Sequence, residues 1–97
     1  MTEANLIAHA MTGALRQLLS ALVAHHATVV GLKEQALADA KRAMDAEIER
    51  MGMEAVGNNG EKIDLSDALQ ASIRIVVDAA LVDARKRIGL SGAQRLN

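Results

Sequence analysis

Several residue types are missing from this 97-residue sequence, which has no cysteine, no proline and no Phe, Trp or Tyr. Without cysteine, the chain has no disulfide, no thiolate metal site and no cysteine nucleophile. Without proline, long helices can run uninterrupted. Without aromatic residues, the core must consist of Leu, Ile, Val, Ala and Met, which bury less apolar area per residue. A short chain with such a core is only marginally stable alone, so this composition favours an oligomer.

The sequence also lacks an excess of charge of either sign. It has 11 Lys and Arg and 12 Asp and Glu, which gives a net charge of −1. This balance argues against a globally basic nucleic-acid-binding protein and against an acidic DNA mimic. A hydrophobic fraction of 51% with 24% charged residues is typical of a globular domain. Glu3 precedes the first apolar run, where a signal peptide would be basic, so we expect a cytoplasmic protein.

The most apolar stretch is Leu6–Leu32, which contains a single formal charge, Arg16. Its large apolar residues recur at helical spacing. The stretch is long enough to cross a membrane. Arg16, Gln17, His25 and His26 interrupt it, however, and charged groups in a bilayer are costly, so we expect no membrane partner. A helix this apolar must instead be covered by the rest of the chain or by a second copy.

After Gly31 the sequence changes character, because residues 33–54 hold ten charges beside a narrower apolar stripe. The spacing predicts an all-α single domain with one helix over about 4–54. A kink at Gly31 is expected rather than a full turn, since one glycine without Pro, Asn or Asp is a weak turn signal. A Gly- and Asn-rich loop over 55–64, an antiparallel returning helix over about 66–88 and a polar tail over 89–97 follow.

These lengths predict how much of the first helix is covered. A helix of about 50 residues is roughly 75 Å long, whereas the returning helix reaches roughly 35 Å. The returning helix therefore covers only residues 30–53 and leaves Leu6–Leu22 open. A real turn at Gly31 would cover this stripe within the chain; otherwise a homo-dimer or higher oligomer must cover it. We expect the oligomer, with an interface formed by Met11, Leu15, Leu18, Leu22, His25 and Val29.

The histidines do not have the spacing of a helical metal site. His25 and His26 are adjacent and point about 100° apart, whereas helical metal pairs lie four residues apart. We expect both at a helix–helix interface; the alternative is a symmetric site between subunits that would make assembly pH-sensitive. The carboxylates show no clustering typical of acid–base catalysis, and the glycines at 57–60 follow no strand. We therefore expect no enzyme activity, no cofactor and no metal.

A basic cluster near the end of the last helix is the other candidate site, formed by Arg85, Lys86 and Arg87 with Arg95 beyond. These cations complement the helix dipole, and Asp83 with Arg87 has ion-pair spacing. The sequence thus supports a non-enzymatic, homo-oligomeric interaction or adaptor module. The alternative is a small regulator that binds duplex nucleic acid or a phosphorylated ligand through this basic end.

Overall fold

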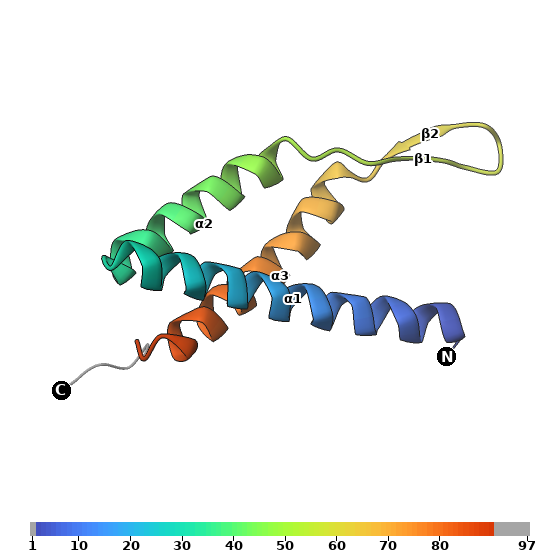
Figure 1. Ribbon diagram of the computed structural model, residues 1–97. Coiled ribbons are helices and arrows are strands. Elements are labelled where there is room, and N and C mark those ends of the chain that lie inside the picture. Colours follow the sequence, from blue (N-terminus) through green and yellow to red (C-terminus); the bar gives the residue numbers. More distant parts are fainter. Residues whose placement is uncertain (1, 91–97) are drawn as a thin grey trace.

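The computed structural model describes residues 2–90 as three helices and a short β-hairpin (Figure 1). The prediction of a mainly helical chain is confirmed. The elements, in chain order, are α1 (Glu3–Val30), α2 (Lys33–Glu49), β1 (Glu54–Val56), β2 (Lys62–Asp64) and α3 (Ser66–Arg87).

A full turn at Gly31 separates α1 from α2, so the prediction of one continuous helix over about 4–54 is wrong. Gly31 has a φ of 85°, a left-handed conformation, and its N–H donates to the carbonyl of Ala27 at 3.0 Å. Glycine reaches this conformation without the cost that a Cβ atom imposes, which makes it an effective helix C-cap. The chain then needs only Leu32 before α2 begins at Lys33.

The segment predicted as a loop over 55–64 contains an antiparallel hairpin, in which Ala55 pairs with Ile63. Its turn is closed by the Gly57 N–H, which donates to the carbonyl of Glu61 at 2.8 Å, and Gly60 has a φ of 80°. Each strand has three residues, which is too short to produce a recognisable alternation of apolar and polar side chains. The hairpin projects beyond the helices (Figure 1).

Helix α3 starts and ends close to its predicted bounds. The Asp64 carboxylate accepts a hydrogen bond from the Ser66 N–H at 2.9 Å, and the Ser66 hydroxyl accepts one from the Met53 N–H at 3.1 Å. These two bonds fix the hairpin to the start of α3. At the other end, Gly89 has a φ of 80° and terminates the helix as expected from sequence.

The core is small and consists mainly of alanine. Among residues 2–90, nine apolar residues are buried: Val23, Ala24, Ala27, Ala36, Leu37, Ile48, Val77, Ala80 and Ala84. Only four of these nine are larger than alanine, whereas fifteen large hydrophobic residues in the same part of the chain are exposed. The radius of gyration is 16.7 Å, compared with about 13 Å for a compact chain of this length. The fold therefore buries little of its own apolar surface.

Candidate interaction surface

The main candidate site is the outer face of α1, which we define as Ile7, Met11, Leu15, Leu18, Leu22, His25 and Val29. All seven side chains lie on one side of the helix because they recur every three or four residues. The six apolar members keep between 51% and 70% of their surface exposed, and His25 is exposed as well. The structure thus places all six predicted interface residues together on one solvent-facing surface.

The opposite, inner face of α1 packs against the rest of the chain, through Ser20, Val23, Ala24 and Ala27. Residues two positions apart on a helix point about 200° apart. Ser20 is therefore opposite Leu18, and Ala24 is opposite Leu22. Helix α1 turns its small side chains inward and its large apolar side chains outward, so the turn at Gly31 does not cover the stripe.

An ion pair between α1 and α3 fixes this orientation. Arg16 donates two hydrogen bonds to the Asp83 carboxylate, at 2.6 and 3.0 Å. The Arg16 side chain hydrogen-bonds Asp83 and, with the nearby charges of Arg16, Lys86 and Arg87, holds the pKa of that carboxyl below its usual range. The only Lys or Arg of α1 is therefore directed toward α3, and the outer face carries no Lys or Arg.

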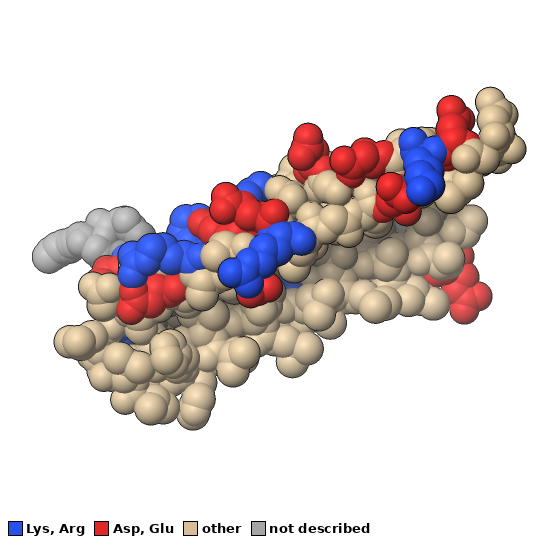
Figure 2. Space-filling model, turned by 90° about the horizontal axis from the view of Figure 1, so that it is seen from above, with Lys and Arg blue, Asp and Glu red and all other residues tan. Residues whose placement is uncertain are grey.

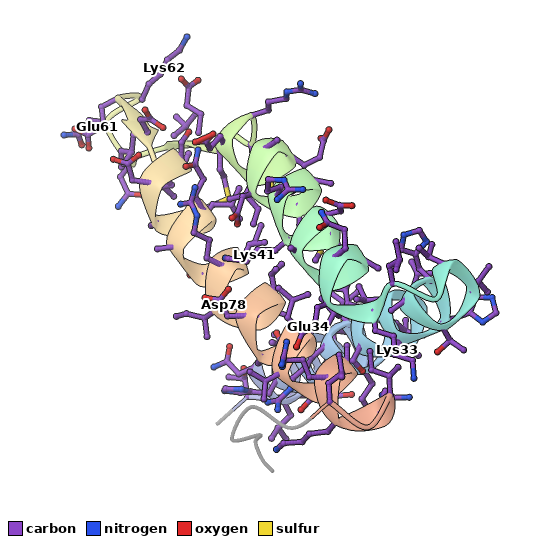
Figure 3. The ribbon with its side chains drawn as sticks, turned by 90° about the vertical axis from the view of Figure 1, so that its left-hand side faces the viewer. Lys33, Glu34, Lys41, Glu61, Lys62 and Asp78 are labelled. Carbon is purple, nitrogen blue, oxygen red and sulfur yellow. The ribbon has the colours of Figure 1, made fainter. Side chains whose placement is uncertain are left out.

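Two further ion pairs join α2 to α3. Arg85 donates two hydrogen bonds to Glu34, at 2.6 and 2.9 Å, and this contact lowers the pKa of the Glu34 carboxyl. Lys41 lies 3.5 Å from Asp78, and Figure 3 shows these two side chains pointing toward each other across the gap between the helices. Charged residues of α2 and α3 thus pair across the contact between these helices, while other pairs, such as Lys41–Asp45, form within α2. In the view of Figure 2 charged side chains gather along one long side of the molecule, and the opposite long side is tan except for an acidic group at one end.

Two apolar grooves lie beside α1, and Leu19 lines both. The first, about 410 Å³, lies between α1 and α3, where Leu15 and Leu19 face Ile73 and Val76. The second, about 400 Å³, lies between α1 and α2, lined by Leu22, His26, Ala43 and Met44 among others. The grooves extend the apolar outer face of α1 toward both neighbouring helices.

The basic end of α3 differs from its prediction. Asp83 pairs with Arg16, so the predicted Asp83–Arg87 pair does not form, and Arg85 is engaged by Glu34. Lys86 and Arg87 are exposed. Arg95, the fourth residue of the predicted phosphate contact, lies outside the described residues. The structure therefore brings together fewer available cations than the sequence suggested.

The three histidines of α1 lie in different surroundings. His25 is part of the outer face, His26 lines the groove toward α2, and His9 lies beside Asn5 and Thr12 near the start of α1. Within residues 2–90, no three His, Asp or Glu side chains are grouped in a way that could hold a metal ion.

Sequence reasoning found the outer face but missed the grooves and the ion pairs between helices. The grooves depend on where the turn at Gly31 directs α2, and nothing in the sequence fixes that direction. The Arg16–Asp83 pair spans 67 residues, beyond the reach of helical spacing rules. One signal was available, because Arg16 is the only formal charge in the apolar stretch Leu6–Leu32 and was therefore a candidate for an ion pair with a carboxylate of another helix.

No protein-family model, no curated protein and no solved structure matches this chain. By length and composition alone, α1 could cross a membrane, and only 11% of its most apolar window is buried by the chain itself. Whether α1 meets a membrane or another protein chain therefore depends on the charges on and around the helix.

Proposed function

We propose that the chain is a non-enzymatic, homo-oligomeric interaction module that buries the outer face of α1 against a second copy. The observation that carries this proposal is the orientation of α1. Its large apolar side chains face away from the core, while its small ones form the core contact. Soluble monomers rarely expose an apolar patch of this extent.

The expected energy gain is sufficient for association. Fully burying one Val, Leu, Ile or Met side chain is worth about 1.5–3 kcal/mol. The six apolar side chains of the outer face are 51–70% exposed, so each copy still has most of this energy to gain. Twelve such side chains in a dimer supply on the order of 10–20 kcal/mol, against roughly 4–15 kcal/mol for the lost freedom of two associating chains.

A second copy explains the outer face better than a membrane does. Helices that lie on membranes carry Lys and Arg beside their apolar face, where they contact anionic lipids. The only Lys or Arg of α1 is Arg16, and Asp83 already binds it. A membrane-spanning α1 would place Arg16 and its partner within the hydrocarbon region, at high cost. A second α1 presents the same uncharged surface and needs no such partner.

Leu18→Asp tests the proposal. Burying a carboxylate without a partner costs several kcal/mol, so the substitution should weaken association by at least about 1,000-fold. Leu18 is 67% exposed within one chain, so the fold itself should tolerate the change. Size-exclusion chromatography with light scattering gives the mass, and circular dichroism checks that the helices persist.

Ile75→Asp is the matched control, because Ile75 is 71% exposed on α3 and lies off the outer face. We expect Ile75→Asp to keep the mass of the unmodified oligomer and Leu18→Asp to fall to the 10.3 kDa monomer. An oligomer that survives Leu18→Asp unchanged would rule out the outer face as the interface.

A further inference from the structure

The two halves of α1 are in different environments. The second half is backed by α2 and α3 through Ser20, Val23, Ala24 and Ala27. In the first half, residues 3–14 contain no buried or half-buried side chain. In Figure 1 this first half extends past the other two helices toward the N-terminus. The first half of α1 is therefore the part of the helix that the rest of the chain covers least, and the part that a partner would cover most.

The two apolar grooves flank α1 between Thr12 and His26, mostly along its supported second half. Their walls are apolar, with Ile73 and Val76 on one side and Ala43 and Met44 on the other. A helix laid along this region would contact the outer face and also place its flanking side chains in the grooves. The unsupported first half of a second α1 fits this description, because Ile7 is exposed on its outer face and Leu6 is exposed beside it.

Side-chain size along the contact line also distinguishes the two orientations of such a pair. At its N-terminal end the outer face is continued, beside Ile7, by Ala4 and Ala8 of the seven-residue pattern, and at the other end it finishes with Val29, just before α1 ends at Val30. A parallel pair would place alanine against alanine at one end and His25 against His25 at the other. An antiparallel pair places the alanine end against His25 and Val29, so that small side chains meet larger ones.

Charge favours the same orientation. Glu3 is the only acidic residue of α1 and lies in its first turn. At the other end, Lys33 begins α2, and its Nζ lies 3.5 Å from the carbonyl of Ile88 at the end of α3, beside exposed Lys86 and Arg87. An antiparallel pair brings Glu3 of one copy toward this basic region of the other and aligns the two helix dipoles favourably. A parallel pair brings Glu3 against Glu3.

From these observations we infer that two copies pair through α1 in antiparallel orientation, about a two-fold axis near Leu18. The first half of α1 from each copy lies over the supported half of the other, beside its two grooves. This inference rests on the proposed function, and it adds which segment of the second copy occupies the surface and in which direction.

Distance measurements between spin labels test the orientation directly. The chain has no cysteine, so Asn5→Cys and Gln17→Cys each introduce a single labelling site. Both positions are exposed and lie off the outer face. With a rise of 1.5 Å per residue and helix axes about 10 Å apart, antiparallel pairing should place the two labels at position 5 about 40 Å apart. The two labels at position 17, near the axis, should be about 25 Å apart or less.

The result can separate this inference from the proposed function. About 40 Å at position 5 with a short distance at position 17 supports antiparallel pairing. Distances of about 25 Å or less at both positions would overturn the orientation while leaving the α1 interface in place. No intermolecular distance at either position, at concentrations where the labelled chains are folded, would overturn the proposed function as well.

Discussion

Small side chains set the contact between α1 and the rest of the chain. Ser20, Ala27, Ala80 and Ala84 are completely buried. The Ser20 hydroxyl donates to the carbonyl of Gln17 at 2.9 Å and so is satisfied within its own helix. Because no side chain in this set extends beyond the β or γ atom, the helices can pack closely at these positions. Most of the large apolar side chains of α1 lie on its other side, which is the residue-level reason that the outer face is so apolar.

Enlarging one of these residues should therefore destabilise the fold. We expect Ala84→Leu to lower the free energy of unfolding by about 1–3 kcal/mol, because the extra atoms have no space in a close-packed contact. Urea unfolding followed by circular dichroism measures the change. Ala71→Leu is the control, since Ala71 is exposed on the same helix and should change stability by less than about 0.5 kcal/mol. Equal effects of the two substitutions would contradict a tight contact at Ala84.

At the scale of the elements, ion pairs hold α3 to both other helices. Arg16 binds Asp83, and Arg85 binds Glu34. Both carboxyls have a pKa lowered by their arginine partners. A group whose pKa is lower in the folded state stabilises that state at neutral pH, and the contribution is lost as the pH falls through the lowered value.

Stability should accordingly decrease on acidification below about pH 4. Asp83→Asn removes one of the carboxyls whose pKa is lowered, so the free energy of unfolding should depend less steeply on pH in the acid range. Urea unfolding between about pH 7 and about pH 2 gives this comparison. Identical slopes for the two proteins would show that Asp83 does not contribute to folding through its ionised form.

The elements also show how far sequence reasoning reaches. In the later helices, apolar residues at helical spacing are buried, among them Leu37, Ile48, Val77, Ala80 and Ala84. The turn at Gly31 was missed because a single glycine was treated as a weak turn signal. One glycine in the left-handed conformation is enough to end a helix without other turn residues. The hairpin was missed because its strands have three residues each. Both errors concern short backbone features, whereas apolar periodicity over many residues was predicted correctly.

At the scale of the whole molecule, the predicted consequence of a turn was also wrong. We expected a turn at Gly31 to cover the apolar stripe within the chain. Instead, α2 and α3 contact the small residues of α1, and Met11, Leu15, Leu18 and Leu22 stay exposed. Periodicity identifies an apolar face but does not say which neighbour covers it. In this chain, the inner face of α1 packs against α2 and α3 because its small residues let the helix axes approach closely.

The extended shape of the molecule also follows from the packing of α2 and α3 on one face of α1. The molecule measures 58 × 30 × 23 Å, and its longest helix, α1, has one half without intrachain cover. Over residues 2–90, the chain buries four large apolar side chains and exposes fifteen. Such a large exposed apolar surface is typical of one subunit of an oligomer and not of a soluble monomer. We therefore expect its stability to depend on protein concentration, as it does when folding and association are coupled.

The mass of the purified protein in native mass spectrometry, followed over a dilution series, tests this account most directly. The account predicts a defined multiple of 10.3 kDa that dissociates only at high dilution. A fully helical 10.3 kDa monomer at every concentration would contradict it, because the outer face of α1 would then be stable in water without a partner.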